Sequence, residues 1–204
     1  MGLLVSILQL HTPEFVKKMA LMQLCKFTAA AFSADVPRLA GLNSEERLAR
    51  YAQFAATQAG QRLQEGREIE TLEKRLYENA VEMGKQQRIW FQPHSMQEMM
   101  TVGRVLYRML QIDFQGDAHG DVVITSCYFS RFYSCEVCRL MSSMDRGLFA
   151  GLSNGGQLTF TARITEGQTC CRGHFRWRSK GMLAGLSTEF TKFETRRDWR
   201  EASR

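Results

Sequence analysis

The sequence predicts an α+β protein in which N-terminal helices are followed by a strand-helix-hairpin unit that forms a small antiparallel sheet. Three observations support this fold class. Apolar residues recur at helical spacing through the first two thirds of the chain, β-branched residues cluster at 122–125, and apolar and polar residues alternate over 157–164 and 171–177. Because 204 residues with 44% hydrophobic content are typical of one folded domain, we expect a single domain over 1–178 and a mixed-charge tail over 179–204.

The first two helices are indicated by their start signals and their apolar faces. The first is expected to start at Pro13, since proline is favoured in the first turn, and to extend to about Phe32. Its apolar face contains Val16, Ala20, Leu24 and Phe27. Asn43 and Glu46 have the spacing of a capping box, so a second helix is expected to start there and to end before Gly66.

Two further helices complete the helical half. The third has the clearest amphipathic spacing and is expected to end near Gly84. Its apolar face contains Ile69, Leu72, Leu76, Ala80 and Met83. Ser95 and Glu98 repeat the spacing of a capping box, so a fourth helix is expected to begin there. Its apolar face contains Met99, Val102, Leu106 and Met109, and residues 113–120 are expected to close this half of the chain.

The last third of the domain changes to strand patterns around one helix. Residues 122–125 are β-branched and follow a glycine, which predicts a strand that ends near Cys127. Residues 135–152 return to helical spacing. Residues 158–177 alternate between apolar and polar on both sides of a turn, which predicts a hairpin with its loop at 165–169.

Charge and composition exclude several classes of protein. The chain carries 27 Lys and Arg against 21 Asp and Glu, a net charge of +6, and residues 176–204 account for +4 of it. Because the excess lies in a mixed-sign tail, we expect no nucleic acid as a partner.

Hydrophobicity along the chain bears on membrane contact and localisation. No apolar run reaches the roughly 18 residues of a membrane span, so we expect no membrane partner. Residues 3–10 lack the features of a secretory signal, so we expect a cytoplasmic protein with reduced cysteines. A homo-oligomer is a further expectation, based on Met96, Met99 and Met100.

Clustered cysteines are the strongest chemical signal in the chain. Of the six cysteines, five fall in the last 80 residues: Cys127, Cys135, Cys138, Cys170 and Cys171. Cys138 and Asp145 are seven residues apart, so they share one face of the expected helix. If the strand that carries Cys127 and the hairpin that carries Cys171 pack on that helix, these four side chains converge.

Three interpretations of this cluster stay open. In the first, Cys127 or Cys138 is a nucleophile and Asp145 is an acid–base group. In the second, the cluster binds a metal ion, with zinc as the expected cofactor. The expected ligands are Cys127, Cys138, Cys171 and His174. In the third, the cysteines pack as small buried hydrophobes.

A small-molecule ligand or substrate is the expected partner. An aromatic cluster at 128–133 follows the expected strand and supplies the apolar wall that ligand pockets have. Three arginines near the cysteines are candidates for binding a substrate carboxylate, because a guanidinium offers paired donors. They are Arg131, Arg139 and Arg163. The sequence contains no P-loop, no dinucleotide fingerprint, no Gly-x-Ser-x-Gly elbow and no His-Glu-x-x-His.

These residues resemble a known family over roughly Ala29 to Trp177. The segments 42–46 and 51–54, Cys127 with its aromatic neighbours, Cys138, Asp145, and Glu166-Gly167 before Cys171 resemble the bacterial L-2-amino-thiazoline-4-carboxylic acid hydrolase-like proteins. The C-terminal part also resembles the 4-vinyl-reductase-type small-molecule-binding domain. The resemblance implies the helix and hairpin order given above and, for the namesake enzyme, hydrolytic opening of a thiazoline ring. We therefore expect a hydrolase acting on a C–N bond of a small heterocycle or amide, or alternatively a non-catalytic module that binds a small molecule or zinc.

Overall fold

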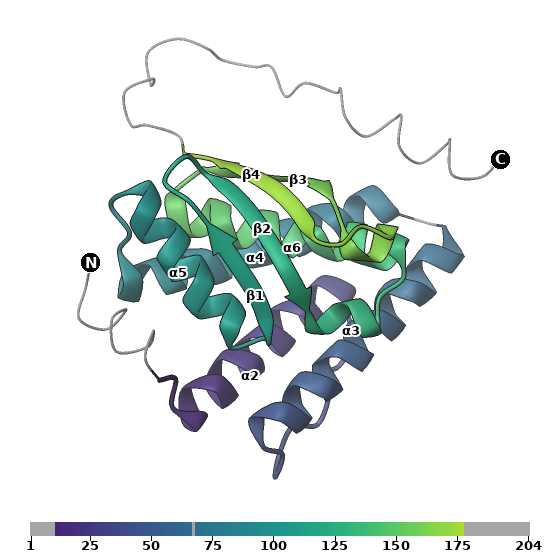
Figure 1. The fold of residues 1–204 in the computed structure, drawn as a ribbon. Coiled ribbons are helices and arrows are strands. Elements are labelled where there is room, and N and C mark those ends of the chain that lie inside the picture. Colours follow the sequence, from purple (N-terminus) through teal and green to yellow (C-terminus); the bar gives the residue numbers. More distant parts are fainter. Residues whose placement is uncertain (1–10, 67, 178–204) are drawn as a thin grey trace, which may run out of the picture.

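A sheet packs against a layer of helices in the computed structural model, which describes residues 11–66 and 68–177 (Figure 1). The helices are α2 (Glu14–Phe32), α3 (Ser44–Glu65), α4 (Ile69–Phe91), α5 (Met96–Arg108) and α6 (Cys135–Ser153). The strands are β1 (Ile112–Gly116), β2 (Asp121–Cys127), β3 (Gln157–Ala162) and β4 (Cys171–Arg176), with short 3-10 helices η1 (Tyr128–Arg131) and η2 (Ile164–Glu166). The predicted α+β class is confirmed, and the tail expected over 179–204 lies outside the described residues.

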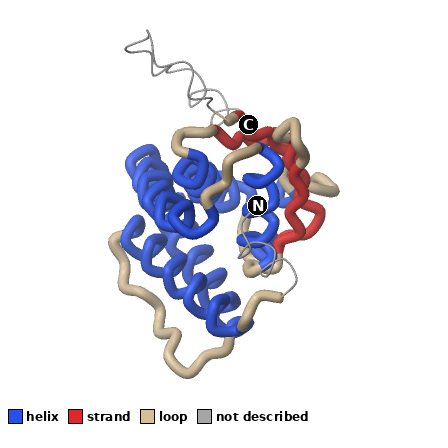
Figure 2. The backbone as a smooth tube through the Cα atoms, turned by 90° about the vertical axis from the view of Figure 1, so that its left-hand side faces the viewer, coloured by secondary structure: helices blue, strands red, loops and turns tan. Residues whose placement is uncertain are grey.

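The sheet is antiparallel and its strand order differs from the chain order. The strands pair in the order β1-β2-β4-β3, so α6 connects β2 to a strand on the far side of β4. Figure 2 shows the sheet as a single layer at one side of the helices. α5 packs on β1 and α6 on β3, which covers the inner face of the sheet. Ile124 of β2 pairs with Cys171 of β4, and both side chains are buried on that inner face.

Helices α3 and α5 begin at the capping residues predicted from the sequence, Asn43 and Ser95. The Asn43 side chain accepts a hydrogen bond from the Glu46 backbone N–H at 3.0 Å, and the Glu46 carboxylate accepts one from the Asn43 N–H at 2.8 Å. Ser95 accepts from the Glu98 N–H at 3.2 Å, but the Glu98 carboxylate accepts from the N–H of His94, so the second capping box forms only in part. None of the helices in residues 11–66 and 68–177 has the length and hydrophobicity that crossing a bilayer requires.

The predicted end of α4 near Gly84 is wrong, because the helix continues to Phe91. Glycine lowers helix stability by about 1 kcal/mol relative to alanine, which is why its presence suggested an end. In the folded protein Gly84 is buried where α4 meets α6. The tertiary contact therefore outweighs the local preference.

Strand β1 was not predicted from the sequence, where residues 113–120 are expected to close the helical half of the chain. Ile112 and Phe114 are buried and alternate with exposed residues, and β1 pairs with β2 along its whole length. Two apolar positions are too few to establish an alternating pattern in a sequence. A register shift between Asp113 and Phe114 disturbs the pattern further.

Helices α4 and α6 approach so closely that only glycine fits at their contact. A Cβ atom at Gly84 would collide with the carbonyl oxygen of Leu148, and one at Gly151 would collide with that of Val81. Gly147, one turn earlier on α6, is confined in the same way. The two helices therefore pack backbone against backbone along a seam of small residues.

We expect Gly151→Ala to lower the free energy of unfolding by about 1–3 kcal/mol, because the added methyl group overpacks the contact with α4. At an open helical position the same change stabilises by up to about 1 kcal/mol. Gly60→Ala in α3 is the matched control, since no atom lies within 4 Å of the added Cβ. Urea denaturation should show the two variants changing stability in opposite directions. A loss of stability at Gly60 equal to that at Gly151 would contradict the close helix contact.

Candidate functional site

A cavity of about 120 Å³ lies between α6 and the inner face of the sheet. The helical layer completes its wall with Leu24, Tyr51, Met83 and Tyr107 from α2, α3, α4 and α5. Most of its lining is apolar or aromatic. The structure brings together in this wall the four side chains whose convergence the sequence predicts, Cys127, Cys138, Asp145 and Cys171.

Local structure explains why these four side chains meet. On α6, Cys138, Ser142 and Asp145 follow one another at helical spacing and all line the cavity. Cys127 is the last residue of β2, and Cys171 is the first residue of β4. The pairing of β2 with β4 sets the two strand cysteines on the sheet side of the cavity, opposite the α6 face.

Asp145 is the group in the cavity that is best suited to exchange protons near neutral pH. Burial raises its pKa from 3.8 to about 6. The Tyr107 hydroxyl, which donates a hydrogen bond to Asp145 Oδ1 at 2.5 Å, and the charges of Arg163 and Arg146 oppose this rise in pKa only in part. A pKa close to the working pH is what general acid–base catalysis requires.

The cavity cysteines are neutral thiols at neutral pH. Burial raises the pKa of Cys127 to about 12 and that of Cys138 to about 11, and it also raises the pKa of Cys171. The nearby Asp145 carboxylate adds to each of these rises, because like charges repel. A cysteine nucleophile needs the opposite shift, toward the thiolate. Cys135 and Cys170, both half-buried, do not line the cavity.

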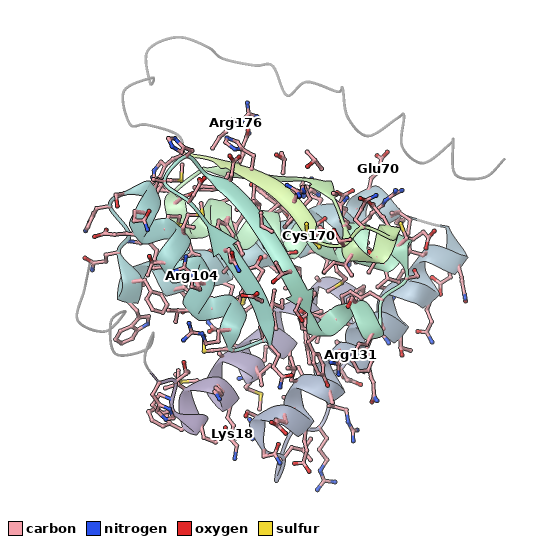
Figure 3. The ribbon with its side chains drawn as sticks, viewed as in Figure 1. Lys18, Glu70, Arg104, Arg131, Cys170 and Arg176 are labelled. Atoms are coloured by element: carbon pink, nitrogen blue, oxygen red, sulfur yellow. The ribbon has the colours of Figure 1, made fainter. Side chains whose placement is uncertain are left out.

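The three predicted arginines have different surroundings. Arg163 lines the cavity, and its guanidinium lies 3.4 Å from the Glu166 carboxylate. Arg139 donates to the same Glu166 oxygen at 2.8 Å and does not line the cavity. Arg131, the last residue of η1, is exposed (Figure 3). Its guanidinium lies 5.6 Å from the Tyr128 ring centre. The structure therefore leaves Arg163 as the arginine that can contact a ligand in this cavity.

The predicted zinc ligands are not assembled. His174 lies on the outer face of the sheet, where its Nδ1 is 2.9 Å from Asp121 Oδ1. It is three residues after Cys171 in β4, and an odd separation in a strand places two side chains on opposite faces. In the part of the chain that the structure describes, no three His, Cys, Asp or Glu side chains are grouped closely enough to hold a metal ion. The donor set therefore does not fit zinc.

Two residues that matter for the cavity were not predicted from the sequence: Tyr107, which lines it, and Glu166, which pairs with Arg163. Tyr107 contacts a partner 38 positions away in the chain, so no local spacing marks it. The sequence spacing could have identified Glu166, because it follows Arg163 by three residues, a separation at which opposite charges can pair in a helical turn. Its second partner, Arg139, comes from α6 and is not visible in the local pattern.

The raised pKa of Asp145 predicts that this residue makes stability fall as the pH rises from about 4 to 6. The folded state binds the Asp145 proton more tightly than the unfolded state, so the stabilisation is present below pH 4 and is lost above pH 6. Its upper limit is about 3 kcal/mol, at about 1.4 kcal/mol per tenfold change in proton affinity.

Asp145→Asn removes the titrating group and keeps an acceptor for Tyr107. Urea denaturation at a series of pH values should give a free energy difference between wild type and variant that changes between pH 4 and 6. Asp35→Asn, which removes a carboxylate from an exposed position, controls for the loss of one negative charge. A difference between wild type and Asp145→Asn that stays constant over this range would contradict the raised pKa.

Comparison of the chain with protein-family models, with curated proteins and with solved structures gave no match. The resemblance to the thiazoline hydrolase-like proteins therefore remains a prediction.

Proposed function

We propose that this protein binds a small ring-shaped molecule in the cavity between α6 and the sheet. The observation that carries the proposal is a carboxyl group, Asp145, held in a cavity whose wall is otherwise mostly apolar. Ligand sites combine an apolar wall with a few polar groups that orient the ligand. The volume of about 120 Å³ is close to that of a cavity of about 150 Å³ that takes up benzene.

Aromatic side chains in the wall support a flat ligand. Phe129 and Tyr133 stack on each other with ring centres 5.4 Å apart, and both line the cavity. Phe160 lines it from the sheet side. Rigid rings keep a cavity open at little entropic cost and offer flat surfaces to a planar ligand.

Binding is tested with benzamide, benzamidine and benzoate, which share one ring and one planar substituent. We expect at least one of them to bind to the wild type and to shift NMR signals of cavity residues. Cys138→Met fills the cavity and should weaken this binding at least about tenfold. Cys170→Met is the matched control, because it changes a half-buried cysteine that does not line the cavity. Equal effects of the two variants, or no binding of any probe, would overturn the proposal.

A second candidate function is hydrolysis of a C–N bond in a small heterocycle, as the resemblance implies. The pKa of Asp145, about 6, favours it, because an ionised carboxylate at neutral pH can take a proton from water. Since the thiols are neutral, we infer that water is the nucleophile. The water oxygen bonds to the C=N carbon, and the bond between this carbon and the ring nitrogen then breaks. The carbon keeps the oxygen as a carbonyl group, and both water protons end on the nitrogen, which becomes an amine.

We expect the protein to convert 2-amino-thiazoline-4-carboxylate to a product heavier by one water, detected by mass spectrometry. Asp145→Asn should lower kcat by roughly 10²- to 10⁴-fold, and Cys127→Ser by less than about tenfold. The value of kcat/KM should rise with pH and level off above about 6, where Asp145 is ionised. No turnover would rule out hydrolysis of this substrate, and an inactive Cys127→Ser with an active Asp145→Asn would reverse the roles.

A further inference from the structure

We propose that the cavity selects a cation, namely a small ring that carries an ammonium or amidinium group whose N–H groups donate to Asp145. This inference rests on the proposed binding function and adds the class of ligand. It departs from the expectation of an arginine that binds a substrate carboxylate. The observation that supports it is that the two charged side chains of the cavity have different partners: Arg163 is paired with a carboxylate, whereas Asp145 contacts a neutral hydroxyl.

Asp145 and Arg163 are the charged side chains among the described residues that line the cavity. The other titratable groups in the wall are neutral at pH 7, because burial raises the pKa of each above its usual value. They are Tyr51, Tyr107, Cys127, Tyr133, Cys138 and Cys171. The charge that a ligand meets in the cavity is therefore set by these two residues.

Arg163 is already paired with an anion. Its Nη1 lies 3.4 Å from Glu166 Oε1, and the same oxygen accepts from Arg139 at 2.8 Å. The Arg163 guanidinium also donates to Ser142 Oγ at 3.4 Å and lies 5.7 Å from the Phe160 ring centre. These contacts hold the guanidinium against the wall and offset its charge, which weakens its attraction for an anionic ligand.

Asp145 contacts a neutral donor instead. Its hydrogen bond comes from the Tyr107 hydroxyl, which carries no charge. Its chain neighbour Arg146 is directed to Glu73 and Ser143. The positive charges of Arg163 and Arg146 attract Asp145 without a direct ion pair. They lower its pKa less than burial raises it. A cationic ligand would supply the direct counter-charge.

Electrostatics in this cavity predict different affinities for cationic, neutral and anionic ligands. A cation gains a charge-assisted hydrogen bond to Asp145, and this bond is stronger where water is excluded. A neutral ligand gains only an ordinary hydrogen bond. An anion is repelled by Asp145 and has to compete with Glu166 for Arg163. The expected order of affinity is cation, neutral, anion.

The probes are benzamidine, benzamide and benzoate, which have nearly the same shape and differ in charge. At pH 8 we expect benzamidine to bind at least about tenfold more tightly than benzamide, and benzoate to bind most weakly, by titration calorimetry. Asp145→Asn should remove the advantage of benzamidine over benzamide. Acetamidine, acetamide and acetate repeat the comparison with smaller molecules, in case the ring limits entry.

Lowering the pH tests the same assignment. Benzamidine affinity should fall below about pH 6 as Asp145 takes up a proton, while benzamide affinity should stay constant. The titratable and charged groups that act on Asp145 from the surrounding elements are Tyr51, Tyr107, Cys127, Tyr133, Cys138, Arg146, Arg163 and Cys171. The arginines stay protonated and the tyrosines and thiols stay neutral over pH 5–8, so the change belongs to Asp145.

Glu166→Gln tests whether pairing of Glu166 with Arg163 contributes to the selectivity for cations over anions. The change leaves Arg163 and Arg139 without their shared carboxylate, so benzoate affinity should rise about tenfold relative to that of benzamidine. Glu136→Gln removes an exposed charge on α6 that does not line the cavity, and it should leave the ratio unchanged. Benzoate binding more tightly than benzamidine to the wild type would overturn the cation assignment and leave the binding proposal intact. No binding of any probe would overturn both.

Discussion

The close contact between α4 and α6 is the constraint on which the rest of the structure depends. Gly84, Gly147 and Gly151 let the two backbones touch, so α6 is buried on the α4 side as well as on the sheet side. Because α4 holds one side of α6 by backbone contacts, the opposite face can border a cavity without collapsing into it. That face carries Cys138 and Asp145.

The sequence predicts most of the fold because most elements carry their own local signals. The capping pair Asn43 and Glu46 marks a helix start in the sequence and forms the predicted hydrogen bonds in the structure. Gly84 misleads because its local effect, breaking a helix, is opposite to its tertiary role, admitting a neighbouring backbone. Strand β1 is missed because a short edge strand with two buried residues carries too little pattern. For Gly84 the deciding interaction, with Leu148 of α6, comes from a residue far away in the chain.

The candidate site is predictable to the same degree and for the same reason. Helical spacing groups Cys138 with Asp145, and strand alternation separates Cys171 from His174. The hydrogen bond from Tyr107 to Asp145 and the shared use of Glu166 by two arginines are long-range pairings that spacing does not encode. Thiol ionisation is a further property that residue type alone does not give, since it depends on how much water reaches each sulfur.

Burial acts in opposite ways on the chemistry of the two residue types in this cavity. A carboxyl group starts with a pKa well below neutral, so loss of water moves the pKa of Asp145 up toward the pH at which proton transfer is efficient. A thiol starts above neutral, so the same loss of water moves the pKa of Cys127 away from that range. Burial in one cavity therefore moves the pKa of the carboxyl group toward neutral and the pKa values of the thiols away from it. For this reason the cysteine cluster, which is the most visible chemical signal in the sequence, marks the location of the cavity, while Asp145 is the group in its wall whose pKa lies near neutral.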